Sequence, residues 1–131
     1  MLMITAFYAS LLAFIYIKLS RNVIRLRRQH NMTVGFGKFK DLEQAIRAHG
    51  NFNEYVPLGL ILLACLEINR IHPIILFILG AFFVTGRYLH AKSFLKKDMD
   101  IALRVKGMKA TFWSMMLMAG TNLLAILVSL I

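Results

Sequence analysis

The sequence predicts an all-α fold, a four-helix bundle that is integral to a membrane. Apolar residues make up 59% of the 131 residues and charged residues only 17%, whereas soluble domains have roughly 45–50% and about 25%. The apolar residues form four long runs with basic blocks between them, which is typical of proteins that cross a membrane several times. A chain of this length is expected to form a single domain, residues 1–131.

The first membrane helix is expected from about Leu2 to Leu19, because about 20 apolar residues span a bilayer. This run lacks a basic start and a small-residue cleavage site, so we interpret it as a retained helix and not as a signal peptide. An amphipathic extension into the cytoplasm is predicted to continue through Arg28. Two glycines mark the loop that follows, roughly residues 30–40.

The second helix is expected to begin near Asp41, where this carboxylate or a neighbour can cap it, and to end at Leu66. Its first half, through Glu54, is polar enough to be partly wet, and its second half is almost wholly apolar. Membrane helices tolerate a proline where neighbouring groups satisfy the backbone carbonyl that it frees. We therefore place Pro57 inside this helix.

Two further helices are predicted in the rest of the chain. A short turn at residues 67–73 leads into a third helix at about 74–89, which extends as far as Phe94 in its longest form. A basic segment at 92–109 separates it from a fourth helix at about 110–131.

The basic residues predict how the bundle is oriented. Eight of the sixteen Lys and Arg residues lie from Lys18 to Arg47, seven lie from Arg87 to Lys109, and Arg70 is in the turn between helices two and three. Because Lys and Arg concentrate in cytoplasmic connections, both basic connections should face the cytoplasm and both termini the other side. Topology and contact with membrane lipids explain the net charge of +10, so nucleic acid is not an expected partner.

One face of the second helix carries four chemically distinct side chains at the point where the helix enters the membrane. They are Arg47, Asn51, Glu54 and Tyr55. At about 100° per residue they fall within roughly one third of the helix circumference. Ionisable groups at this depth need partners and indicate a functional site by default. The alternative is a structural network, in which Arg47 and Glu54 pair with charges on the first and third helices.

Two other groups of basic side chains lie near the same membrane boundary. Arg87 and His90 are three residues apart on the third helix, although an arginine at such a boundary is often only a topology signal. Arg21, Arg25 and Arg28 form a stripe at the end of the first helix. The stripe would contact anionic lipid if it faces outward and carboxylates if it faces inward.

Together these side chains predict a ligand that carries several charges of both signs. Arginines would hold its carboxylates, Glu54 would hold an ammonium and Asn51 would bond to a peptide amide. Glutathione, a small zwitterionic peptide with excess negative charge, satisfies these requirements. No zinc, phosphate-loop or serine-hydrolase motif is present, so no metal is expected. Cys65 is the only cysteine, which excludes an intrachain disulfide.

The segment RAHGNFNEY, residues 47–55, resembles the R-x-x-x-N-x-x-E-Y signature of the MAPEG superfamily, the membrane-associated proteins in eicosanoid and glutathione metabolism. Pro57 follows, as in many members. Chain length, four helices, the long basic first loop and the inferred topology also match, so the resemblance covers essentially the whole chain. Residues 106–111 look most like the bacterial branch, which implies a location in a bacterial inner membrane.

The resemblance implies a homotrimer that binds glutathione, as a cosubstrate, in a charged cavity between subunits near the cytoplasmic side. The residues expected to bind glutathione are Arg25, Arg28, Arg47, Asn51, Glu54, Tyr55 and Arg87. Arg104 resembles the arginine that stabilises the glutathione thiolate. His90 matches a position that is His or Tyr in characterised members, and we assign it a secondary catalytic role.

The sequence departs from the family pattern at three positions of the expected site. Phe94 stands where a tyrosine is expected, and Val105 and Met108 stand where one branch has Ser and Tyr. These departures weaken the prediction of eicosanoid chemistry in particular, and they leave a thiolate with fewer hydrogen-bond donors.

Three functions are therefore compared. The expected one is a glutathione-dependent transferase or peroxidase whose lipophilic substrate, a small electrophile, arrives from the bilayer. The first alternative is a non-catalytic lipid- or glutathione-binding membrane protein, since one member of the superfamily presents lipid to another enzyme. The second is a small proton-coupled exporter with Glu54 as its membrane carboxylate.

Overall fold

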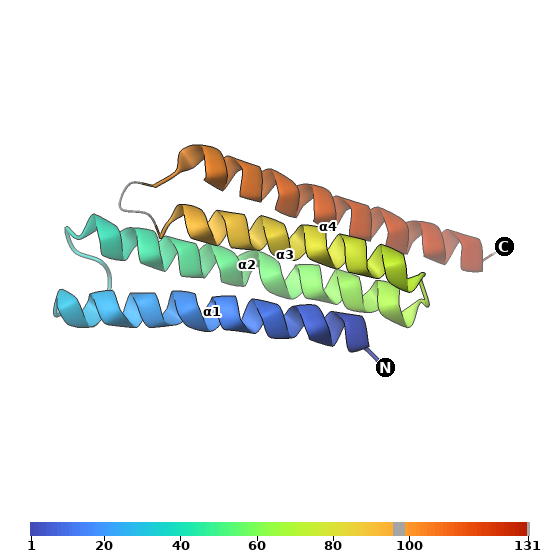
Figure 1. Ribbon diagram of the computed structural model, residues 1–131, viewed down its shortest axis with the longest axis horizontal. Coiled ribbons are helices and arrows are strands. Elements are labelled where there is room, and N and C mark those ends of the chain that lie inside the picture. The colour runs from blue at the N-terminus through green and yellow to red at the C-terminus, as the bar shows by residue number, and fades with distance from the viewer. Residues whose placement is uncertain (96–98, 131) are drawn as a thin grey trace.

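The computed structural model describes residues 1–95 and 99–130, which form an antiparallel bundle of four helices (Figure 1). The helices are α1 (Met3–Gln29), α2 (Lys40–Ile68), α3 (Pro73–Ser93) and α4 (Ile101–Ser129). All four are long and apolar enough to cross a membrane. This confirms the predicted helices and is the architecture of an integral membrane protein.

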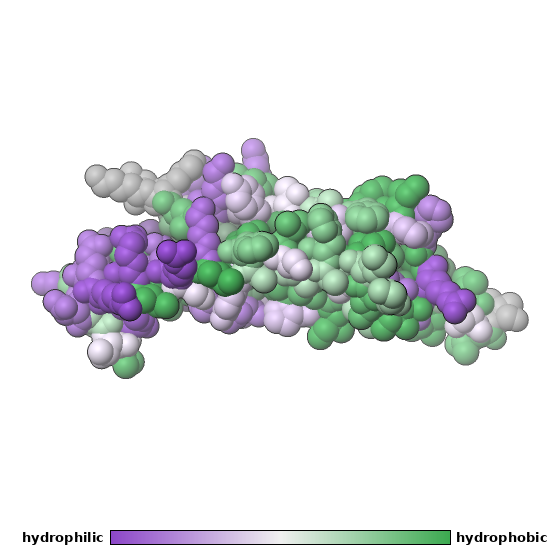
Figure 2. Space-filling model, turned by 60° about the horizontal axis from the view of Figure 1, so that its bottom comes forward, coloured by the Kyte–Doolittle hydropathy of each residue, from purple (hydrophilic) through white to green (hydrophobic). Residues whose placement is uncertain are grey.

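The two ends of the bundle differ in composition. The end of α1, the start of α2, the end of α3 and the start of α4 lie at one end of the bundle, and the start of α1 and the end of α4 lie at the other (Figure 1). Hydrophilic side chains gather at the end with the two connections, while apolar side chains cover most of the remaining face (Figure 2). The two basic connections therefore share one end of the molecule, which we call the basic end.

The start of α4 differs most from the prediction. The helix begins at Ile101 and not near Ala110. Asp100 caps it, because its side-chain Oδ1 accepts a hydrogen bond from the Leu103 backbone N–H at 2.9 Å. The prediction was wrong because basic residues interrupt the apolar run, whereas a capped helix continues beyond the membrane surface without needing apolar residues.

The boundaries of α2 also differ from the prediction. Phe39, and not Asp41, occupies the N-cap position, and it makes no side-chain cap hydrogen bond. Asp41 Oδ1 does accept a hydrogen bond from the Leu42 backbone N–H at 2.9 Å. Asp41 lies in the first turn, with Oδ2 2.8 Å from His30 Nε2, which ties the two ends of the loop together. The helix continues through Pro57 as predicted. It ends at Ile68 and not at Leu66, so Glu67 and Ile68, which were expected in the turn, belong to the helix.

Small residues bring α3 and α4 together near the basic end. A Cβ atom added to Gly86 would lie 2.8 Å from the Thr111 backbone nitrogen, and one on Gly107 would meet the backbone of His90. Glycines at such a crossing allow close backbone approach in membrane helices. The close approach places the side chain of Arg87, which follows Gly86, directly against Thr111 of α4.

A carboxylate fastens α1 to α2 at the end that carries the termini. Glu67 Oε1 accepts a hydrogen bond from the Ile4 backbone N–H at 2.9 Å, and Oε2 accepts two from Thr5, from its backbone N–H at 2.8 Å and its hydroxyl at 2.7 Å. A helix N-terminus has unpaired N–H groups and a partial positive charge. Glu67 therefore caps α1 from a neighbouring helix.

Candidate functional site

Arg87 is the buried centre of the site, with only 1% of its surface exposed. Its Nε donates to Thr111 Oγ1 of α4 at 2.9 Å, and Nη1 donates to Asn51 Oδ1 at 3.0 Å and to the Asn51 carbonyl at 3.3 Å. The guanidinium carbon lies over the Tyr55 ring, 5.1 Å from the centroid. Arg87 thus joins three helices and orients two of the four motif residues on α2.

The charge on Arg87 is held by neutral groups. Within residues 1–95 and 99–130, no carboxylate forms an ion pair with it. Thr111, which accepts from Nε, donates its own proton to the Gly107 carbonyl at 2.9 Å. A buried cation without a counter-ion makes the surrounding region electropositive.

A pocket of about 350 Å³ opens between α2 and the α3–α4 end of the bundle. Its walls include Arg47, Asn51 and Glu54 of α2, together with Phe94 and Arg104. A second pocket of about 350 Å³ adjoins it, because the two share four residues, namely Glu43, Arg47, Phe94 and Arg104. Three of the four predicted residues on α2 therefore meet the predicted thiolate-stabilising arginine in one place, which we call the α2–α4 pocket.

Arg104 is held against an aromatic ring. Its guanidinium carbon lies 5.1 Å from the centroid of Phe94, a cation–π arrangement, and its Nη1 lies 3.7 Å from Met99 Sδ. Phe94 itself is buried. The residue at the expected tyrosine position therefore supports Arg104 through its ring but has no hydroxyl group to donate to a thiolate.

The two other charged residues of the motif are not neutralised across the bundle. Arg47 Nη2 lies 3.9 Å from Glu43 Oε1 on the same helix, and both side chains are substantially exposed. Glu54 is exposed and makes no ion pair with any residue in the described part of the chain. No described ion pair joins either residue to α1 or α3, so the structural-network alternative lacks the contacts it requires.

Tyr55 and His90 lie behind the pocket walls. The Tyr55 ring is half-buried between Arg87 and Phe112, whose ring centroid is 5.7 Å away. His90 is 3% exposed, and its ring centroid lies 5.3 Å from that of Phe94. Neither side chain lines the α2–α4 pocket. The catalytic role of His90 stays a prediction.

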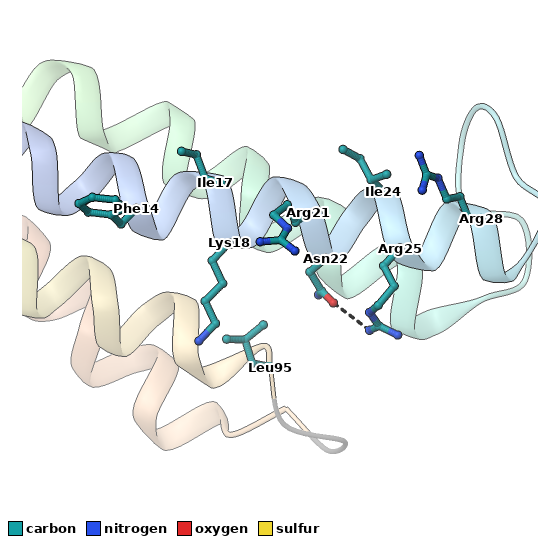
Figure 3. Close-up of a pocket in the computed structure, with 9 residues that line it drawn as sticks. All are labelled: Phe14, Ile17, Lys18, Arg21, Asn22, Ile24, Arg25, Arg28 and Leu95. Atoms are coloured by element: carbon teal, nitrogen blue, oxygen red, sulfur yellow. Dashed lines mark hydrogen bonds between the residues drawn. The ribbon is translucent and has the colours of Figure 1, made fainter.

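Arg25 and Arg28 lie in a different part of the molecule. They line an open groove of about 880 Å³ along the exposed side of α1 (Figure 3). Arg25 Nη2 donates to Asn22 Oδ1 at 2.9 Å. No residue of this groove lines the α2–α4 pocket, so within one subunit these arginines do not meet the motif on α2.

The sequence analysis missed Thr111, which holds Arg87 in place. Thr111 lies at the start of a largely apolar run, two residues after Lys109, and its hydroxyl group is not part of any charged motif. The available signal was its spacing of four residues from Gly107. A small residue and a hydroxyl residue one turn apart are typical of a close helix–helix crossing in a membrane.

The bundle and its pocket define a class of protein, namely four-helix integral membrane proteins with a charged pocket at the basic end. The family model described as "MAPEG family" matches residues 5–124. The chain is 36% identical over 121 residues to the protein named "Inner membrane protein YecN" of Escherichia coli strain K12, and equally so to that of Escherichia coli O6:H1. Each match covers 92% of this chain and 91% of the relative. The chain therefore belongs to the MAPEG family.

Proposed function

We propose that this protein is a membrane-bound, glutathione-dependent transferase or peroxidase that acts on lipophilic electrophiles. The observation that carries the proposal is that Arg47, Glu54 and Arg104 line one pocket. Guanidinium groups form bidentate pairs with carboxylates, and a carboxylate without an ion-pair partner can accept an ammonium. The pocket wall holds two arginines and two carboxylates, Glu43 and Glu54, and the buried Arg87 lies behind it, bonded to Asn51. This mixed set of charges can hold both the carboxylates and the ammonium of glutathione. Membership of the MAPEG family supports the same ligand.

Arg104 is the residue best suited to stabilise a thiolate. A free thiol has a pKa of about 8.5, and a nearby cation lowers it; each unit corresponds to about 1.4 kcal/mol. In conjugation, the sulfur anion forms a bond to an electrophilic carbon, the leaving group departs with the bonding electrons, and the thiol proton goes to solvent. In peroxide reduction, two glutathione thiols supply two electrons and become a disulfide, while the O–O bond breaks to give an alcohol and water.

The proposal includes a homotrimer in which a neighbouring subunit supplies Arg25 and Arg28. These two arginines are exposed and are separate from the α2–α4 pocket of their own subunit. Native mass spectrometry of the detergent-solubilised protein should show three chains. If only monomers are found, Arg25 and Arg28 cannot contact a ligand in the α2–α4 pocket, and the proposed homotrimer is rejected.

We further propose that the basic end faces the cytoplasm and that both termini lie on the opposite side. Fifteen of the sixteen Lys and Arg residues lie in the sequence segments 18–47 and 87–109, which matches the distribution in cytoplasmic loops. The name of the Escherichia coli relative supports an inner membrane location. The α2–α4 pocket would then open toward the cytoplasm and could take up glutathione there.

Isothermal calorimetry on detergent-purified protein tests glutathione binding. Saturable binding is expected in the native protein, and both Arg47→Ala and Glu54→Ala should abolish it. Lys109→Ala is a matched control, since it removes a charge at the same end without altering a pocket residue. If the native protein shows no binding at millimolar glutathione, the enzyme proposal should be dropped.

A second measurement separates catalysis from binding alone. Ultraviolet absorbance of the thiolate should appear when glutathione binds, and Arg104→Ala should lower it at constant occupancy. Turnover with a general electrophile should fall in parallel. Binding without turnover would favour the alternative, a non-catalytic glutathione- or lipid-binding protein, with which the loss of hydroxyl groups at Phe94, Val105 and Met108 is consistent.

A further inference from the structure

A second groove lies between α1 and α3 and shares no residue with the α2–α4 pocket. Its volume is about 280 Å³. Most of its wall is apolar, and two lysines complete it. The residues that line it are Ile15, Lys18, Leu19, Tyr88, Ala91, Lys92 and Leu95.

The two lysines lie at the same level of the bundle. Helices α1 and α3 both run toward the basic end (Figure 1), and Lys18 and Lys92 lie in the parts of these helices near that end. Lys18 extends from α1 toward Leu95 at the end of α3 (Figure 3). Lys92 Nζ lies 5.9 Å from the centroid of the Tyr88 ring. Both ammonium groups thus border one apolar groove.

The charge at this groove is uncompensated in the described part of the chain. No acidic residue lines the groove, and neither lysine forms a described ion pair. Long basic side chains at the end of a membrane helix extend their charge to the depth of the lipid head groups. Basic residues at that depth attract anionic lipid. The groove therefore combines a cationic mouth at head-group level with an apolar interior below it.

We propose that the groove between α1 and α3 is a specific site for one anionic phospholipid. Lys18 and Lys92 hold the phosphate, and part of one acyl chain packs against Ile15, Leu19 and Ala91. The groove is slightly smaller than the roughly 300–1,000 Å³ of small-molecule pockets, so it takes a segment of a lipid and not a whole molecule. The groove adjoins the larger α1 groove of Arg25 and Arg28, with which it shares Lys18 and Leu95. None of its residues is among those proposed to bind glutathione, so the lipid proposal does not depend on the glutathione proposal.

Photo-crosslinking tests the proposal directly. The purified protein is placed in phosphatidylcholine nanodiscs that contain a small fraction of phosphatidylglycerol with a diazirine in its acyl chain. Peptide mapping should locate the label on α1 around residues 15–19 and on α3 around residues 88–95. Phosphatidylcholine with the same diazirine should label these segments much less. Equal labelling by the two lipids would overturn the proposal, because the site would then lack selectivity for charge.

Paired variants separate a built site from general surface attraction. Each lysine near the surface contributes about a fivefold increase in affinity for anionic lipid, so Lys18→Gln with Lys92→Gln should lower the phosphatidylglycerol preference by about 25-fold. The charge-conserving pair Lys18→Arg and Lys92→Arg should retain it, which also tests whether the positions tolerate substitution.

The matched control pair, Lys106→Gln with Lys109→Gln, removes two charges from α4 at the same end and should leave the label unchanged. If this pair lowers labelling as much as the groove pair does, the attraction is general and the site is rejected. Millimolar inorganic phosphate is added in a separate sample. Displacement of the label by free phosphate would assign the two lysines to a soluble anion and would also overturn the lipid proposal.

Discussion

Two of the three glutamates on helix α2 are in opposite circumstances, Glu54 in the α2–α4 pocket and Glu67 at the end with the termini. Glu67 accepts three hydrogen bonds from the first turn of α1. Glu54 is exposed and has no ion-pair partner among the described residues. The chain itself therefore supplies hydrogen-bond donors to the Glu67 carboxylate, whereas the Glu54 carboxylate is available to a ligand.

The comparison shows how to separate a structural charge from a functional one in a membrane protein. Both residues are carboxylates on a membrane-spanning helix, and depth alone would mark both as functional. The difference lies in whether the chain supplies the complementary groups. Replacing Glu67 should therefore change stability and not binding, and replacing Glu54 should do the reverse.

The largest effect is expected from Glu67→Ala. The change leaves the Ile4 and Thr5 N–H groups at the start of α1 without their acceptor. We expect a loss of about 2 kcal/mol in the free energy of unfolding, measured in detergent by denaturant titration. Glutathione affinity should be unchanged. Glu67→Gln keeps one acceptor oxygen and should recover part of the loss. An unfolding curve identical to that of the native protein would show that the cap does not stabilise the bundle.

Glu54→Gln is expected to act on binding. The amide keeps the shape of the side chain but cannot pair with an ammonium, so glutathione affinity should fall about tenfold, or about 1.4 kcal/mol. Calorimetry measures this value. The free energy of unfolding should stay within about 0.5 kcal/mol of the native value. If Glu54→Gln destabilises the protein as much as Glu67→Ala does, Glu54 also has a structural role, and the contrast between the two glutamates is wrong.

Thr111→Val sharpens the comparison at a buried position. Valine keeps the shape of threonine but removes the oxygen that accepts from Arg87 Nε, so we expect a loss of about 1 kcal/mol in unfolding free energy. Glutathione affinity should fall modestly as well, because Arg87 also orients Asn51. Thr111→Ser retains the hydroxyl and should restore affinity. If the valine variant binds normally, Asn51 is positioned without the help of Arg87.

Phe94→Tyr should have the smallest effect. The added hydroxyl lies on the wall of the α2–α4 pocket beside Arg104, where it can donate to a thiolate. One such hydrogen bond should lower the pKa of the bound glutathione thiol by about half a unit, which a pH titration of thiolate absorbance would detect. Stability should hardly change. An unaltered titration would show that the thiol does not reach this wall.

Local sequence determined the helices and the composition of the site. The length of an apolar run decides whether it spans a bilayer, and helix periodicity places Arg47, Asn51 and Glu54 on one face whatever surrounds them. Both predictions could be made because they depend on near neighbours in the chain. The start of α4 at Ile101 could not be predicted in this way, because hydropathy marks only the part of a helix that lies within the lipid.

Tertiary structure alone decided which of these residues meet. The crossing at Gly86 and Gly107 brings Arg87 against Thr111, and the fold of α1 against α2 makes Glu67 a cap for a helix start far away in sequence. The separation of Arg25 and Arg28 from the α2–α4 pocket has the same origin. Which helix faces make contact depends on close packing between segments distant in sequence. A local pattern such as the spacing of Gly107 and Thr111 marks a face suited to close contact but does not identify the helix that it meets.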